Sequence, residues 1–149
     1  MQNLRSAVVL LAGAGDIDLA GCSSVYQTMP VGEVLEQRDF YNAVVRVETR
    51  LDPHDLLDAC KQLERELGRE EGGPRHSPRP IDIDLLLLDD VALSDERLVV
   101  PHPEIGARRF VLLPLSELDP ELTLPDGRTV ARALAELGTD QRAERVSEL

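Results

Sequence analysis

The sequence predicts a mixed α+β fold, in the order helix, strand, strand, helix, strand and then short elements. Apolar residues recur at helical spacing over residues 3–12 and 52–67. Apolar runs bounded by glycine, proline and aspartate indicate strands at 17–28, 39–49 and 81–88. Two helices and three strands in this order favour helices packed on a sheet.

The first three elements are bounded by their own residues. The helix over 3–12 ends at Gly13, because glycine is the usual residue just beyond a helix C-terminus. The strand over 17–28 is followed by the breaking sequence "MPVG". The strand over 39–49, "DFYNAVVRVET", is rich in the β-branched and aromatic residues that suit a pleated surface.

The second helix has capping residues at both ends. Asp52 is placed to accept a hydrogen bond from the first turn, and Pro53 suits the first helical position. Gly68 is expected to end this helix. The stretch "EEGGPRHSPRP" over 70–80 has the glycines and prolines of a loop.

The C-terminal third contains shorter signals. Pro125-Asp126-Gly127 is a turn sequence, and the apolar spacing over 130–137 predicts a last short helix. No linker, repeat or low-complexity tract appears, so a single domain is expected over residues 1–149. Residues 140–149 read as an acidic tail with no predicted element.

Charge and composition exclude several classes of protein. The net charge of −12 argues against an extended nucleic-acid surface, which needs many basic phosphate contacts. No apolar run approaches the roughly 20 residues that span a bilayer, and the start lacks the pattern of a secretory signal. Cys22 and Cys60 make neither a disulfide framework nor a zinc site, so both are expected to be buried. These observations favour a soluble cytoplasmic protein.

The most informative stretch is "RPIDIDLLLLDD", which places two carboxylates inside an apolar strand. Side chains alternate along a strand, so Asp82 and Asp84 face the same way, with Cα atoms roughly 6.5–7 Å apart. Two adjacent carboxylates repel unless a cation or a proton lies between them. Magnesium takes one or two carboxylates together with substrate phosphates, so the pair indicates a Mg²⁺–phosphate site.

A second interpretation of the same pair stays open. A half-exposed strand with a solvated polar face would show the same "IDID" pattern. Aspartate is a poor strand residue, which argues against two of them for solubility alone. Arg79 before the pair and His102 after it add groups that suit a phosphate ligand.

Several linked stretches resemble one family in the same order and spacing. They are "SSVYQTMPVG", "RDFYNAVVRVET", "LERELGR", "GPRHSPRPIDIDLLLLDD", "ERLVVPHPEIGARRFVLLPLSEL" and "LDPELTLPDGR". Together they resemble the 6-hydroxymethyl-7,8-dihydropterin pyrophosphokinases of folate biosynthesis. The resemblance implies a ferredoxin-like α+β sandwich that transfers pyrophosphate from ATP to the pterin, leaving AMP, with two Mg²⁺ ions.

The resemblance also implies a role for individual residues. Asp82 and Asp84 match the residues that bind the metal ions, and Arg69 and Arg79 match arginines that steady the phosphates. The positions that match ATP contacts are Glu64, Arg97, His102 and Arg108. The positions that match pterin contacts are Thr28, Val31, Phe40, Asn42 and Phe110, with the two phenylalanines stacking on the ring.

The chain departs from the family pattern at its start and in its loop. It begins at the helix "MQNLRSAVVLLA", so the family's first strand is expected to be absent. His76-Ser77 stand where the family usually has Trp-Gly, and Glu70 and Glu71 stand where basic residues are common. The alternatives to an active enzyme are a catalytically weak or inactive pterin- or nucleotide-binding relative and a ferredoxin-like interaction module. The expected state is a monomer or weak homodimer.

Overall fold

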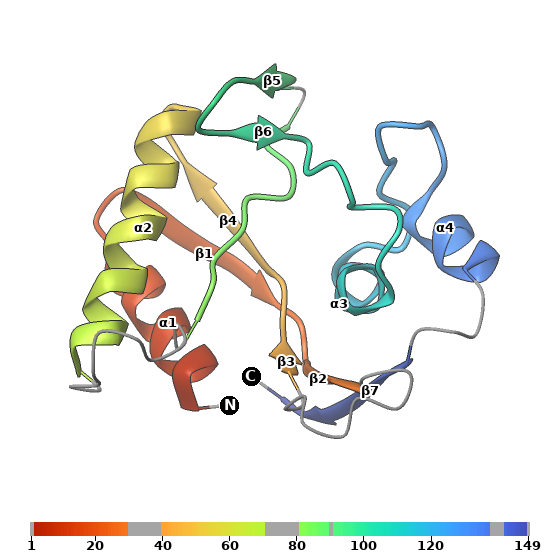
Figure 1. Ribbon diagram of the computed structural model, residues 1–149, viewed down its shortest axis with the longest axis horizontal. Coiled ribbons are helices and arrows are strands. Elements are labelled where there is room, and N and C mark those ends of the chain that lie inside the picture. Colours follow the sequence, from red (N-terminus) through yellow and green to blue (C-terminus); the bar gives the residue numbers. More distant parts are fainter. Residues whose placement is uncertain (1, 30–39, 71–80, 90, 138–141, 149) are drawn as a thin grey trace. The chain divides into compact units, whose positions relative to one another are not determined.

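The computed structural model describes residues 2–29, 40–70, 81–89, 91–137 and 142–148 (Figure 1). Its helices are α1 (Gln2–Gly13), α2 (Pro53–Glu70), α3 (Arg109–Leu118) and α4 (Val130–Glu136). Its strands are β1 (Ile17–Cys22), β2 (Val25–Met29), β3 (Phe40–Asn42), β4 (Val45–Thr49), β5 (Leu93–Ser94), β6 (Val99–Val100) and β7 (Arg142–Ser147). Helices together with antiparallel strand pairs confirm the predicted α+β class.

The chain divides into two compact units. The first unit contains Met1–Leu19 and Val47–His102, and the second contains Ala20–Arg46 and Pro103–Leu149. We call the first the metal unit, because it carries the predicted metal ligands Asp82 and Asp84, and the second the ring unit, because it carries Phe40 and Phe110, which are predicted to stack on the pterin ring.

The metal unit is built around α1 and α2, which lie side by side (Figure 1). One apolar cluster joins them through Ala7 and Leu67 and includes Ile81. A second cluster is formed by Leu57 of α2 with Leu98 and Val100 of the β5–β6 hairpin. The 81–88 segment contributes to both clusters, so burial of its apolar side chains holds it against α2.

In the ring unit, a three-stranded antiparallel sheet has the order β3-β2-β7. Helix α3 packs on β2 and β7 and also contacts α4. Leu112 of α3 and Val130 of α4 are completely buried in this unit. These contacts fix the strand that carries Thr28 against a helix that carries Phe110.

The helix predictions are confirmed, except at one end. Asp52 caps α2 as predicted, because its Oδ1 accepts a hydrogen bond from the backbone N–H of Asp55 at 2.9 Å. Gly68 does not end the helix, which continues to Glu70. A glycine inside a helix costs only about 1 kcal/mol, and Leu67, which is 2% exposed, anchors this last part of α2 in the core.

The first two predicted strands are each interrupted. The predicted strand 17–28 consists of β1 and β2, and the predicted strand 39–49 consists of β3 and β4. The interruptions meet at Ser23 and Val44: the N–H of Ser23 donates to the carbonyl of Val44 at 2.8 Å, and the N–H of Val44 donates to Ser23 Oγ at 2.9 Å. The hydroxyl oxygen of Ser23 therefore takes the place of one backbone acceptor between the strands. On the two sides of this interruption the strands have different partners: β1 pairs with β4, whereas β2 pairs with β3 and β7.

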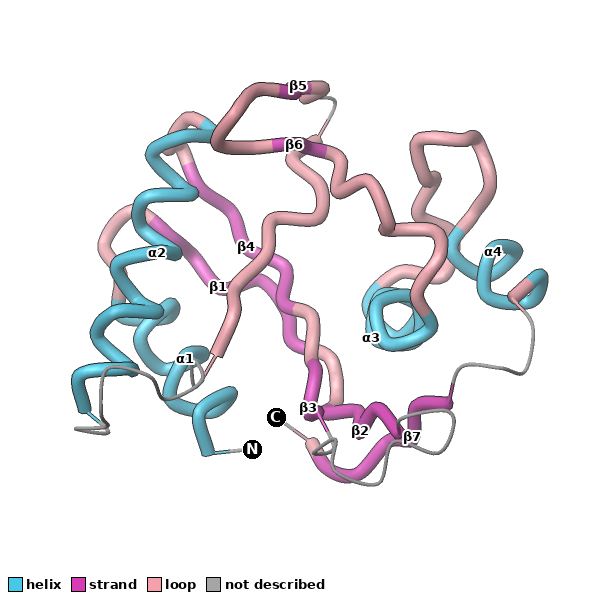
Figure 2. Tube along the Cα trace, in the orientation of Figure 1, coloured by secondary structure: helices cyan, strands magenta, loops and turns pink. Residues whose placement is uncertain are grey.

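The prediction of a strand over 81–88 is wrong. This segment is drawn as a loop (Figure 2), and it pairs with no strand among the described residues. Its first residues still show the burial alternation of an extended backbone, with Ile81 buried and Asp82 exposed. The alternating sequence pattern correctly predicted which side chains are buried and which are exposed. It did not predict a strand correctly, because a strand also requires hydrogen bonds to a neighbouring backbone.

Near the C-terminus, α3 and β7 had no predicted counterpart. The sequence of α3 contains Pro114, which is buried inside the helix. The tail forms β7, which pairs antiparallel with β2. The turn at 125–127 is confirmed, with Gly127 at a φ of +90°, and α4 confirms the short helix predicted over 130–137.

The two cysteines differ in exposure. Cys60 is buried as expected, whereas Cys22 is exposed, so that expectation is wrong for Cys22. Burial alternates along β1 from Ile17, which is buried, and this places Cys22 on the exposed face. Burial raises the pKa of the Cys60 thiol to about 11, and the nearby Glu64 carboxylate adds to the increase.

Among the described helices, none is long and apolar enough to cross a membrane.

Candidate functional site

The carboxylates of Asp82 and Asp84 form the centre of the candidate site in the metal unit. Both residues are exposed, and the residue between them, Ile83, is half-buried. Neither carboxylate is paired with a basic residue in the described ranges. Two exposed carboxylates on one face without a cationic partner are suited to a divalent cation that also binds phosphate oxygens.

The described residues contain no cluster of three or more histidine, cysteine, aspartate or glutamate side chains arranged to hold a metal ion. The pair therefore supplies two ligands, which is the number that Mg²⁺ commonly takes from a protein when a substrate supplies the others. The donor set fits magnesium bound together with a nucleotide.

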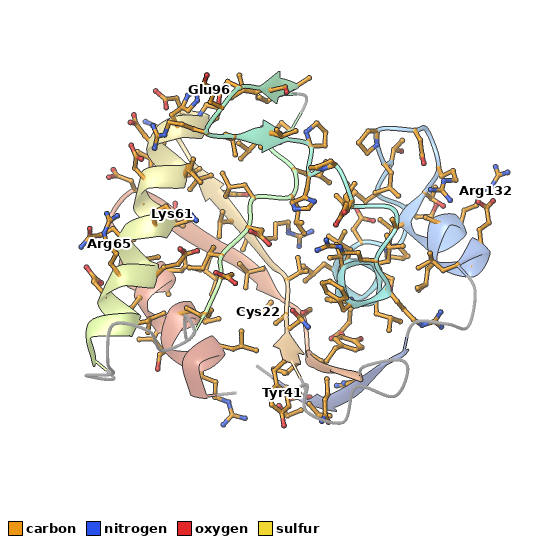
Figure 3. All side chains as sticks on the ribbon, viewed as in Figure 1. Cys22, Tyr41, Lys61, Arg65, Glu96 and Arg132 are labelled. Carbon is orange, nitrogen blue, oxygen red and sulfur yellow. The ribbon has the colours of Figure 1, made fainter. Side chains whose placement is uncertain are left out.

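Glu64 of α2 contacts the backbone between Asp82 and Asp84. Helix α2 carries this residue on its buried face, where its side chain is 6% exposed. Its Oε1 accepts a hydrogen bond of 2.7 Å from the backbone N–H of Ile83, and its Oε2 lies 3.4 Å from Lys61 Nζ (Lys61 is labelled in Figure 3). A buried carboxylate therefore contacts the backbone between the two exposed ones.

Two further residues predicted to contact ATP lie in the metal unit. The backbone N–H of His102 donates to the carbonyl of Leu86 at 2.9 Å, so His102 is attached to the 81–88 segment. Arg97 is exposed and pairs with Asp58 of α2. Backbone N–H groups of Arg97 and Leu98 donate to Asp95, and these bonds lower the pKa of that carboxyl.

In the ring unit, adjacent strands bring together residues predicted to contact the pterin. Thr28 of β2 is opposite Phe40 of β3, and Asn42 of β3 is opposite Tyr26. The four positions therefore occupy one short stretch of a single antiparallel ladder. Backbone pairing sets the spacing of these positions.

Arg108 and Phe110 lie at the start of α3 in the same unit. The Arg108 guanidinium lies over the Phe110 ring, with 5.5 Å between its central carbon and the ring centroid. Arg108 also pairs with Glu104. A cation and an aromatic face attract each other in this arrangement. The structure thus places Arg108, which is predicted to contact ATP, next to Phe110, which is predicted to contact the pterin.

One polar network of the ring unit was not predicted. Glu117 of α3 accepts hydrogen bonds from the Ser24 N–H at 2.9 Å, the Ser24 hydroxyl at 2.7 Å and the Tyr26 hydroxyl at 2.6 Å. Burial and the bond to Glu117 raise the pKa of Tyr26 to about 12. Although burial alone would raise the pKa of Glu117, the bonds from Tyr26 and Ser24 lower it below its ordinary value.

This network anchors the start of β2 to α3 and so supports the strand that carries Thr28. The sequence contained no sign of it, because Ser24 and Glu117 are 93 residues apart.

Some predicted residues lie outside what the structure describes. Val31 and Arg79 fall outside the described residues, as do His76 and Ser77. Arg69 lies in the last turn of α2, but only its backbone is described.

Comparisons with known proteins identify the class to which this fold and these residues belong. The sequence model of the 7,8-dihydro-6-hydroxymethylpterin-pyrophosphokinase (HPPK) family matches residues 1–120. The chain belongs to this family, whose fold is ferredoxin-like. The resemblance found in the sequence motifs is therefore confirmed.

Individual relatives agree with this assignment. The chain is 44% identical over 134 residues to the 2-amino-4-hydroxy-6-hydroxymethyldihydropteridine pyrophosphokinase of Methylorubrum extorquens, covering 90% of this chain and 83% of that protein. It is also 44% identical over 134 residues to the enzyme of the same name from Pseudomonas aeruginosa, covering 90% and 82%. A folate synthesis bifunctional protein of Arabidopsis thaliana is 42% identical over 118 residues. That match covers 79% of this chain but 24% of the plant protein.

Proposed function

We propose that this chain transfers the pyrophosphoryl group of ATP to the hydroxymethyl group of 6-hydroxymethyl-7,8-dihydropterin in tetrahydrofolate biosynthesis. The observation that carries the proposal is the pair of exposed carboxylates, Asp82 and Asp84, on one face of a segment inside the family match. Membership of the pyrophosphokinase family and the names of the bacterial relatives support it.

The reaction forms one bond and breaks one bond. The hydroxymethyl oxygen of the pterin attacks the β-phosphorus of ATP, and the bond from that phosphorus to the oxygen bridging to the α-phosphate breaks. AMP leaves with the bridging oxygen, and the hydroxyl proton is released. No described side chain is needed as a covalent partner, so the protein acts by holding the reactants in line and balancing charge.

Asp82 and Asp84 would hold two Mg²⁺ ions. When bound, magnesium neutralises phosphate charge and clamps the phosphate oxygens. We assign Arg69 and Arg79 to steadying the transferred phosphates, since arginine offers a planar fork of donors. The same proposal assigns ATP binding to Arg97, His102 and Arg108.

The pterin would be bound by residues of the ring unit. Phe40 and Phe110 are assigned to stacking on the flat ring, which gains both contact area and ring–ring attraction. Thr28, Val31 and Asn42 are assigned to the polar edge of the ring. The chain is further proposed to act in the cytoplasm, as a single-domain monomer or weak homodimer that binds no nucleic acid.

The test is AMP release from ATP and Mg²⁺, measured with and without 6-hydroxymethyl-7,8-dihydropterin. AMP that appears only with the pterin supports the proposal. A folded sample that binds the pterin but releases no AMP would contradict it and favour a relative that binds without turnover. A folded sample that binds neither ligand would favour an interaction module.

A further inference from the structure

The backbone between the two candidate metal ligands is held by a buried side chain. The N–H of Ile83 donates to Glu64 Oε1 at 2.7 Å, and this hydrogen bond lies midway between Asp82 and Asp84. The segment has no strand partner among the described residues. The Glu64 carboxylate therefore supplies the Ile83 N–H with the acceptor that a neighbouring strand would otherwise provide.

The direction of this bond is important for the two aspartates. In an extended backbone the N–H groups point sideways, whereas the side chains point alternately to the two faces. A lateral bond at Ile83 therefore fixes the rotation of the segment about its own axis. That rotation decides where the carboxylates of Asp82 and Asp84 point.

Glu64 is well placed to act on the backbone and poorly placed to contact a ligand. Its side chain is only 6% exposed, so little of it is accessible to a nucleotide. Its second oxygen faces Lys61 Nζ at 3.4 Å, which partly balances the buried charge. A buried acceptor that is lost leaves a donor unsatisfied, so this contact is costly to remove.

We propose that Glu64 is a positioning residue for the metal-binding pair: by accepting the Ile83 N–H it sets the orientation of Asp82 and Asp84. This inference rests on the proposed function and deepens it. It gives Glu64 a different role from the ATP contact that the sequence motif implies. Glu64 acts through the backbone and touches neither substrate.

Three variants test the proposal. Glu64→Leu removes the acceptor, and Glu64→Gln keeps a side-chain oxygen without the charge. Glu66→Gln is the matched control, because Glu66 lies on the same helix and accepts a hydrogen bond from Gln62 at 3.4 Å. Two quantities are measured for each: hydrogen exchange of the Ile83 amide without substrates, and kcat and KM for ATP in pyrophosphoryl transfer.

The expected results separate positioning from ligand binding. In Glu64→Leu the Ile83 amide exchanges at least about tenfold faster, and kcat falls about 100-fold with a smaller change in the KM for ATP. Glu64→Gln restores both quantities to within about threefold of wild type, because an amide oxygen accepts the same hydrogen bond. The Glu66→Gln control behaves like wild type.

Two outcomes would overturn the proposal. One is unchanged exchange at Ile83 in Glu64→Leu. The other is a Glu64→Gln enzyme that protects Ile83 yet has lost its turnover, because the charge of Glu64 would then be what the reaction uses. If Glu64→Leu does not fold, the Glu64→Gln results decide.

If the wild-type protein releases no AMP, the proposed function fails. The exchange of Ile83 in the variants then still supports or overturns the positioning role.

Discussion

The 81–88 segment of the metal unit and the β2–β3 pair of the ring unit hold their candidate residues in different ways. In the β2–β3 pair, the ladder itself places Thr28 opposite Phe40. In the 81–88 segment no ladder is present among the described residues. The stretch around Asp82 and Asp84 is held by the bond from the Ile83 N–H to Glu64, by the bond from the His102 N–H to the Leu86 carbonyl and by the apolar clusters. One arrangement depends on backbone pairing, the other on particular side chains.

This difference has a consequence for substitutions. A ladder tolerates many side chains, because the bonds that set its spacing belong to the backbone. A segment held by one buried carboxylate and a few leucines depends on those residues individually. We therefore expect changes near 81–88 to affect turnover most, and changes around β2 and α3 to affect pterin binding and stability.

The largest effect is expected from Asp84→Ala. Removing one of two magnesium ligands should lower turnover by about 10²–10³-fold and leave the fold intact, because the side chain is exposed. The measurement is steady-state AMP release, with circular dichroism to check folding. Glu96→Ala is the control, since Glu96 is also exposed in the metal unit. Wild-type turnover in Asp84→Ala would show that the metal assignment is wrong.

A smaller effect is expected from Phe110→Ala in the ring unit. Losing the stacking ring should raise the KM for the pterin about tenfold with little change in kcat, because ring stacking contributes about 0.5–1.5 kcal/mol beyond the buried area. Phe110→Tyr keeps the ring and serves as the matched control. Equal KM values for Phe110→Ala and Phe110→Tyr would remove Phe110 from the pterin site.

The third prediction concerns stability. Glu117→Gln should lower the free energy of unfolding by about 1 kcal/mol near neutral pH, because the bonds from Ser24 and Tyr26 are to a charged acceptor. The pKa of Glu117 is lowered in the folded protein, so its contribution is complete above the ordinary value of 4.5 and is lost as the pH falls through the lowered pKa. The difference between the two proteins should therefore shrink in acid.

Urea unfolding near neutral pH and below pH 4.5 measures this change. Glu121→Gln is the control, because Glu121 is exposed on the chain just after α3. A difference between Glu117→Gln and wild type that grew in acid would contradict the role assigned to the Glu117 carboxylate.

The smallest effects are expected at the exposed pair of Arg97 and Asp58. Both side chains are more than half exposed, at 54% and 59%, so losing the pair should change stability by less than about 1 kcal/mol. Arg97→Ala should nevertheless raise the KM for ATP, whereas Asp58→Ala should not. If both variants raise that KM equally, the ion pair and not Arg97 itself supports ATP binding.

Local patterns predicted much of the fold and the identity of the candidate residues. The helical spacing and the Asp52 cap predicted α2, and the "IDID" alternation predicted that Asp82 and Asp84 share an exposed face. Both signals depend on neighbours in the chain, within about one helical turn or two strand residues. The roles predicted for the remaining residues came from the family motifs.

Contacts between distant parts of the chain could not be predicted in this way. The pairing of β7 with β2, the Glu117 network and the bond from Ile83 to Glu64 each join residues far apart in the sequence. A one-dimensional pattern indicates which face of a strand is buried, but it does not say whether another backbone lies beside it.

The sequence by itself therefore determined the prediction of which residues bind metal and pterin, because side-chain chemistry and local periodicity can be read residue by residue. Only the tertiary structure decided what holds them. It showed that β2 is paired on both sides, and that the segment carrying Asp82 and Asp84 is attached through a buried glutamate. The physical reason is that each backbone polar group needs a partner, and the identity of that partner depends on how the folded chain is packed.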